Sequence, residues 1–70
     1  MSASIQIMVN GEKRDVPAGI GVKDLLSHLK LPGDRVAIER NLEILPRSQW
    51  ISTAVQPGDT YEIVHLVGGG

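Results

Sequence analysis

Hydrophobic residues alternate with other residues near both ends of the chain. Ile5, Ile7 and Val9 occupy every second position, which predicts a strand whose odd-numbered residues face the core. The segment 61–67 is rich in β-branched and aromatic residues, which suit a pleated, half-buried surface and predict a second strand. Because both segments are long and apolar, we expect them in the middle of one sheet, as parallel neighbours.

Between these two segments the hydrophobic period changes to that of a helix. Four apolar residues recur at i, i+3, i+4 and i+7, which predicts one buried face of a helix over residues 22–30. They are Val22, Leu25, Leu26 and Leu29. Gly21 is expected at the N-cap, and Lys30 near the last turn is expected to interact favourably with the helix dipole.

Short elements join these three segments. Asn10-Gly11 predicts a type I′ hairpin turn, followed by a polar edge strand over 12–16. Two further short strands are expected, and residues 46–50 are predicted to form a loop or a single helical turn. The two short strands span residues 36–39 and 43–45. Trp50 and Ile51 are expected to fold back onto the core.

The economical arrangement of these elements is an α+β fold in which one helix lies across one face of a mixed sheet of four to five strands. This is the ubiquitin-like β-grasp arrangement. We expect residues 1–66 to form the domain and residues 67–70 to form a flexible glycine tail.

The tail is the first candidate functional site. Gly68, Gly69 and Gly70 carry no side chains, so the segment can enter a narrow active site and present the α-carboxylate of Gly70. The alternative is a frayed terminus without function, since chain ends are often disordered.

A second candidate lies beside the tail. If Tyr61 and Ile63 face the helix, Val64 and Leu66 face outward, in line with Met8 on the first strand. An apolar patch on an exposed sheet face that leads into a reactive tail predicts a docking surface. The alternative is that these are ordinary exposed apolar residues, which are common.

The composition excludes several classes of protein. Seventy residues make one domain, and 41% hydrophobic and 21% charged residues are typical of a globular chain. A net charge of −1 argues against nucleic-acid binding through bulk positive charge. The absence of cysteine excludes disulfides, thiolate catalysis and cysteine-based metal sites. With no signal peptide and no apolar run of about 20 residues, we expect a cytoplasmic protein without membrane contact.

No constellation of residues indicates an enzyme. His28 and His65 are far apart in the chain, and Ser48 lacks a glycine elbow. Arg40 and Arg47 flank the Asn41 loop and are available for an acidic partner or for solvent. The scattered carboxylates are expected at turns and solvated faces. They include Asp15, Asp24, Asp34, Glu39 and Asp59.

Taken together, the chain resembles the ThiS family, the ubiquitin-like sulfur carriers of thiamine biosynthesis. The resemblance covers essentially the whole chain, and the Pro46-Arg47-Ser48-Gln49-Trp50 segment points to the thiamine branch. Its other parts are the 5–11 hairpin, the 22–26 helix start, residues 36–39, Asn41, the 57–59 turn and the diglycine end. Two departures are the third glycine at the end and Gly21, where the family often has a capping threonine.

The resemblance implies a carrier that catalyses nothing and binds no cofactor. A ThiF-type adenylyltransferase using ATP and Mg²⁺ would adenylate the Gly70 carboxylate. Sulfur from a cysteine desulfurase or a related persulfide donor would convert it to a thiocarboxylate, and a ThiG-type thiazole synthase would receive that sulfur. The alternatives are a carrier like the small subunit of molybdopterin synthase, a ubiquitin-like modifier joined to lysines, and a binding module with an inert tail.

Overall fold

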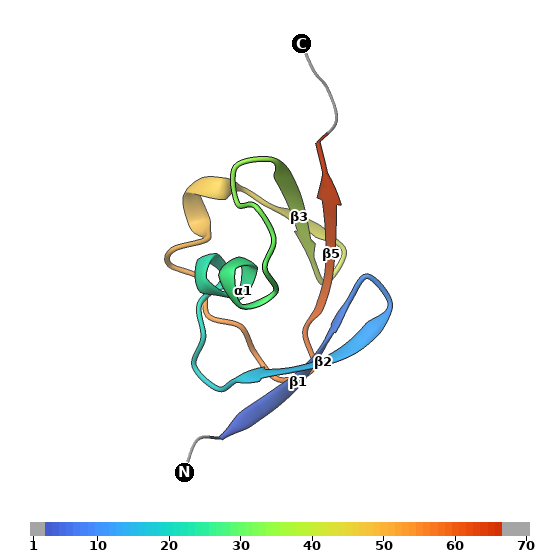
Figure 1. The fold of residues 1–70 in the computed structure, drawn as a ribbon, viewed down its shortest axis with the longest axis vertical. Coiled ribbons are helices and arrows are strands. Elements are labelled where there is room, and N and C mark those ends of the chain that lie inside the picture. The colour runs from blue at the N-terminus through green and yellow to red at the C-terminus, as the bar shows by residue number, and fades with distance from the viewer. Residues whose placement is uncertain (1–2, 67–70) are drawn as a thin grey trace.

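A computed structural model describes residues 3–66 of the chain. Their elements are β1 (Ser4–Val9), β2 (Glu12–Pro17), α1 (Val22–His28), β3 (Val36–Arg40), β4 (Glu43–Leu45), the 3₁₀ helix η1 (Arg47–Gln49) and β5 (Thr60–His65). The strands form one sheet in the order β2-β1-β5-β3-β4. β1 and β5 are parallel and the other pairs are antiparallel, with α1 across one face (Figure 1). The predicted α+β, ubiquitin-like β-grasp fold is confirmed.

The β1–β2 turn also strengthens the centre of the sheet. Asn10 and Gly11 have φ values of 51° and 82°, as a type I′ turn requires. The Asn10 side chain then reaches β5, where its Nδ2 donates to the Ile63 carbonyl at 3.1 Å and its Oδ1 accepts from the Ile63 N–H at 2.8 Å. The side-chain amide therefore satisfies main-chain groups of β5 beyond the point where the β1–β5 pairing ends.

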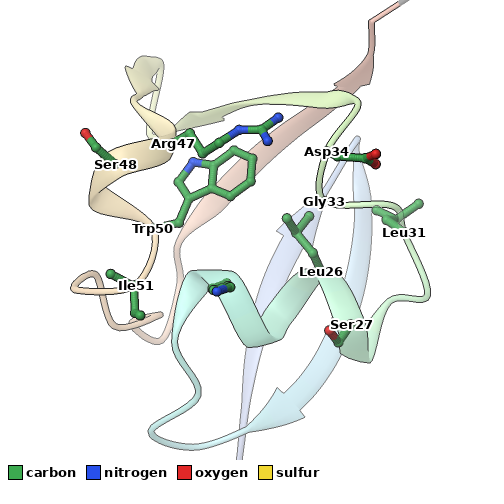
Figure 2. A pocket seen from close by; sticks show the side chains of 10 residues that line it. Leu26, Ser27, Leu31, Gly33, Asp34, Arg47, Ser48, Trp50 and Ile51 are labelled. Carbon is green, nitrogen blue, oxygen red and sulfur yellow. The ribbon is translucent and has the colours of Figure 1, made fainter.

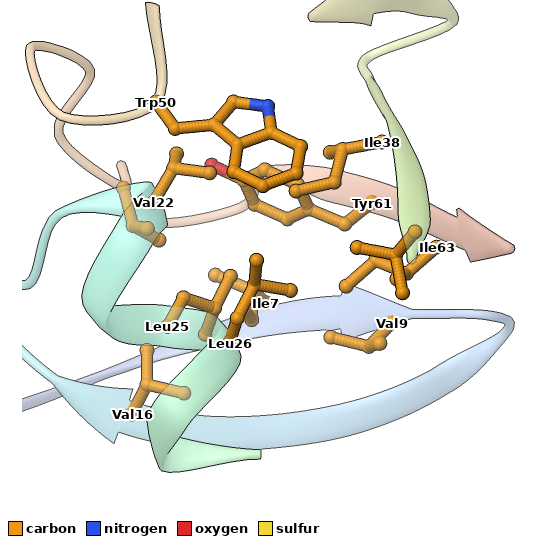
Figure 3. Close-up of a cluster of buried hydrophobic side chains, with 12 residues drawn as sticks. Ile7, Val9, Val16, Val22, Leu25, Leu26, Ile38, Trp50, Tyr61 and Ile63 are labelled. Carbon is orange, nitrogen blue, oxygen red and sulfur yellow. The ribbon is translucent and has the colours of Figure 1, made fainter. Parts of the chain in front are cut away.

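One hydrophobic core fills the space between the sheet and α1 (Figure 3). Tyr61 is fully buried at its centre. Trp50 closes one end with 5% of its surface exposed, and its Nε1 donates to the Leu45 carbonyl at 3.0 Å. The prediction that Trp50 folds onto the core is confirmed. The same prediction for Ile51 is wrong, because its side chain is 75% exposed. Trp50 has helical φ and ψ values, so two successive side chains point about 100° apart and only one reaches the core.

The helix ends earlier than its apolar pattern suggests. Leu29 is the C-cap, and Lys30 adopts a left-handed conformation with a φ of 60°. The Lys30 N–H donates to Ser27 and the Leu31 N–H donates to Leu26, which together form a Schellman motif. Lys30 therefore lies just beyond the last turn, near it as predicted, and is the residue at which the helix stops.

The β3–β4 turn contains a local conflict between sequence and backbone. Asn41 and Leu42 have φ values of 51° and 70°, so the turn needs two left-handed residues. The second is a leucine, whose Cβ is strained in that conformation. Its side chain is 87% exposed and therefore gains little burial in return.

We expect Leu42→Gly to raise the free energy of unfolding by about 0.5–1 kcal/mol, because the released strain exceeds the extra entropy of glycine in the unfolded chain. Urea denaturation measures the change. Leu42→Ala is the control and should give no gain, since alanine keeps the Cβ. Equal stabilisation by both replacements would contradict the strain argument.

Candidate functional site

β5 is the element that positions the candidate site. It lies between β1 and β3 in the sheet, and its direction leads toward the C-terminal end (Figure 1). Just beyond β5, the Leu66 N–H donates to the Arg35 carbonyl at 2.8 Å, so the described chain is held up to its last residue. The predicted tail residues Gly68, Gly69 and Gly70 lie outside the described residues.

Val64 and Leu66, two of the three residues predicted for docking, lie at the end of the described chain. Val64 and Leu66 are 52% and 54% exposed, and Val64 is on the outer face of the sheet, away from α1. Met8 is half-buried on the same face but lies opposite Thr60, about 13 Å along the strand from Val64. The residue beside Val64 on the neighbouring strand is Ala37.

The outer face holds further residues that the sequence reasoning did not select. Ile44 is 68% exposed and lies opposite Glu39, which in turn lies opposite Glu62. The alternation of β3 and β5 places all three side chains on the face away from α1. That alternation was visible in the sequence, but the pairing of strands that brings the three residues into one row was not.

Asp59 lies at the end of the predicted 56–59 turn, but unlike the other carboxylates expected at turns and solvated faces it is buried. It is only 5% exposed. Its Oδ2 accepts hydrogen bonds from Arg40 Nε at 3.0 Å, Tyr61 OH at 2.9 Å and the Gln56 N–H at 2.9 Å, and its Oδ1 accepts from Asn41 Nδ2 at 3.1 Å. The Arg40 Nε therefore contacts a carboxylate of this domain, while the Arg40 side chain remains 29% exposed. The cluster ties together the β3–β4 turn, the 56–59 turn and the start of β5.

The hydrogen bonds in this cluster determine its ionisation. Burial acts to raise the pKa of Asp59, but donation from Gln56, Asn41, Tyr61 and Arg40 outweighs burial, so the net pKa is lowered. Burial, followed by the hydrogen bond to Asp59, raises the pKa of Tyr61 to about 12. The carboxylate is thus charged and the phenol neutral over the physiological range.

A shallow concavity of about 480 Å³ lies between α1 and residues 47–51 (Figure 2). Its floor includes Leu26 and Trp50, and the Arg47 guanidinium sits 5.2 Å from the centre of the indole ring. Lys23 and Asp34 complete a rim that carries both signs of charge. Among the described residues this lining brings together no nucleophile with a base, so it does not define a catalytic site.

The two histidines lie on different elements. His28 is exposed on α1 and His65 is exposed at the end of β5. Within residues 3–66, no group of three or more His, Cys, Asp or Glu side chains is arranged to hold a metal ion. No helix in this part of the chain is long and apolar enough to span a bilayer.

Comparison with known proteins agrees with this architecture. A crystal structure of the thiamine biosynthesis protein ThiS of Geobacter metallireducens superimposes with a TM-score of 0.83 at 35% identity, covering 94% of this chain and 100% of that one. The sulfur carrier protein ThiS of Escherichia coli is 33% identical over 94% of this chain and 100% of its own length.

A larger protein also matches. The thiazole synthase of Paramagnetospirillum magneticum is 44% identical over 66 residues, which cover 94% of this chain and 20% of that protein. The chain therefore spans about one-fifth of the length of this relative.

Within residues 3–66, the sheet order, the position of β5 between β1 and β3, and α1 across one face define a ubiquitin-like β-grasp protein. Within that class, the ThiS family model matches residues 5–70. The chain belongs to the ThiS family.

Proposed function

We propose that this protein is a sulfur carrier of thiamine biosynthesis and that the carboxylate of Gly70 is its reactive group. The observation that carries the proposal is the match of the ThiS family model over residues 5–70, which includes the glycine run at 68–70. The carrier supplies the acyl group and the docking surface, while partner enzymes supply the catalysis and use ATP and Mg²⁺.

The chemistry follows from the low reactivity of a carboxylate. An oxygen of the Gly70 carboxylate attacks the α-phosphate of ATP, pyrophosphate leaves, and an acyl-adenylate forms. The terminal sulfur of a persulfide then displaces AMP and forms an acyl disulfide. A thiol reduces that disulfide, is itself oxidised to a disulfide, and releases the carrier thiocarboxylate. Thiazole synthase then receives the sulfur without free sulfide being formed.

The fold suits a carrier that must visit several enzymes. The end of β5 pairs with β3, and the Leu66 N–H donates to the Arg35 carbonyl, so the sheet holds the chain up to the residue before the tail. Ordering Gly68, Gly69 and Gly70 in an active site costs roughly 1–2 kcal/mol of backbone entropy per residue. We propose that docking of the outer face through Val64 and Leu66, with Met8 at its far end, offsets this cost.

Other carriers and modifiers with glycine ends are less well supported. The family match and the Geobacter relative favour the thiamine branch over a molybdopterin synthase small subunit. The similarity to part of a thiazole synthase supports that enzyme class as the sulfur acceptor. A lysine-linked modifier would form an isopeptide bond, and an inert tail would form no product.

The test is the intact mass of the protein after incubation with its adenylyltransferase, ATP, Mg²⁺, a desulfurase, cysteine and a thiol reductant. We expect one sulfur in place of one oxygen, trapped by an alkylating reagent and located on Gly70. A variant lacking Gly70 is the matched control and should stay unchanged. An unmodified parent protein in an enzyme mixture that modifies a known ThiS carrier would refute the proposal.

A further inference from the structure

Two glutamates face each other at the centre of the outer face. Glu39 on β3 and Glu62 on β5 are direct cross-strand partners, and the alternation of both strands places them on the side away from α1. Glu39 is half-buried and Glu62 is exposed. Side chains at such a position are about 5 Å apart at Cβ, and like charges there are destabilising.

The pair has no counter-ion in the described part of the chain. Within residues 3–66 the ion pairs are Arg14 with Glu12 and Arg40 with Asp59. Arg40 follows Glu39 directly, but its side chain lies on the opposite face in the Asp59 cluster. The repulsion between Glu39 and Glu62 is therefore not relieved by an ion pair within this part of the domain.

Apolar side chains flank the two carboxylates. Ile44 extends the row on one side, where it lies opposite Glu39 on β4 and is 68% exposed. The next outward-facing pair along β3 and β5 is Ala37 with Val64. The face thus has an acidic centre and apolar neighbours, an arrangement in which the apolar area contributes affinity and the charges select the partner.

We propose that Glu39 and Glu62 form a recognition site for an arginine that the activating enzyme presents between apolar side chains of its docking surface. This inference rests on the proposed function and specifies the partner surface for it. A guanidinium offers several donors in one plane and can bridge two neighbouring carboxylates, which an ammonium group does less well. Binding replaces a repulsion with two attractive contacts, so the unfavourable pair in the free carrier becomes favourable in the complex.

The test compares two double variants that lose the same number of charges. Glu39→Gln with Glu62→Gln removes the acidic pair and keeps its shape. Asp24→Asn with Asp34→Asn removes two exposed carboxylates on the side of α1. Calorimetric titration against the adenylyltransferase at low and high salt gives the affinities, and thermal melting gives the stabilities.

We expect the glutamate variant to bind about tenfold more weakly than the parent, with a flatter dependence on salt. Its melting temperature should be equal to or above that of the parent, because a repulsion has been removed. The aspartate variant should bind within about twofold of the parent, since distant exposed charges contribute little beyond a Debye length. If the glutamate variant binds more weakly but melts no lower than the parent, the pair acts in recognition and not in stabilising the fold.

Equal affinities and salt dependences for the two double variants would overturn the recognition site and leave the proposed function intact. A melting temperature of the glutamate variant well below that of the parent would also overturn it, since the pair would then stabilise the fold. ATP–pyrophosphate exchange by the parent is measured in parallel. If the parent supports no exchange, the proposed function itself fails, and the two failures are distinguished.

Discussion

Replacing Asp59 by alanine is expected to lower the free energy of unfolding by about 3–5 kcal/mol, the range seen when one partner of a buried charge pair is removed. The variant loses four hydrogen bonds at once. Arg40 is left without its carboxylate, and the buried Tyr61 hydroxyl is left without its acceptor. For a domain of 70 residues this is a large share of the total stability.

Asp34 is a matched control within the same chain. Both aspartates end a Pro-Gly-Asp triplet, but Asp34 is exposed whereas Asp59 is buried. Urea denaturation followed by circular dichroism should show a change of about 0.5 kcal/mol or less for Asp34→Ala, as for most surface substitutions. Similar losses for the two variants would mean that the triplet acts through its turn and not through the buried cluster.

The same cluster sets the pH range of stability. Because the folded pKa of Asp59 is lowered, its contribution is present above the pKa of an unfolded aspartate, about 3.9, and is lost as pH falls through the folded value. The pKa of Tyr61 is raised to about 12, so its contribution is complete below the unfolded value and is lost as pH rises toward 12. The decrease in the free energy of unfolding on acidification should therefore be smaller in Asp59→Ala than in the parent protein, when both are compared by urea denaturation at several pH values.

Trp50→Ala is expected to lower the free energy of unfolding by about 3–5 kcal/mol, as for other large aromatic residues removed from a core. The change opens a cavity at the end of the core and removes the hydrogen bond to the Leu45 carbonyl. It also removes the ring beneath the Arg47 guanidinium.

The adjacent residue provides the comparison for Trp50. Ile51 is 75% exposed, so Ile51→Ala should change the free energy of unfolding by about 0.5 kcal/mol or less. Thermal and urea denaturation of the two variants measure the difference. A large loss for Ile51→Ala would show that this side chain is packed in solution and would contradict its exposed position.

Much of the fold could be predicted from the sequence because it depends on local periodicity. Alternation at Ile5, Ile7 and Val9 predicted a strand, and the spacing from Val22 to Leu29 predicted the helix face, since each pattern matches a backbone period. Asn10-Gly11 predicted its turn because few residue pairs accept two positive φ values. The glycine run at the end predicted a reactive tail, and this stays a prediction because residues 67–70 lie outside the described residues.

The predictions that failed concern the burial of individual side chains, which residues nearby in the sequence do not determine. Two identical Pro-Gly-Asp triplets have opposite environments, because Asp59 alone lies near side chains from the β3–β4 turn and β5. Likewise, Trp50 and Ile51 are both apolar, and only the direction of one helical turn decides which is buried.

Local patterns along the chain specified the elements, the outward direction of Val64 and the position of the glycine run. The tertiary structure decided the burial of Asp59 and the meeting of Glu39 with Glu62. That meeting depends on the register of two strands more than 20 residues apart in the chain, where a shift of one residue would turn one of the two side chains to the other face. Local patterns follow from the backbone period, whereas cross-strand neighbours follow from long-range packing of the whole chain.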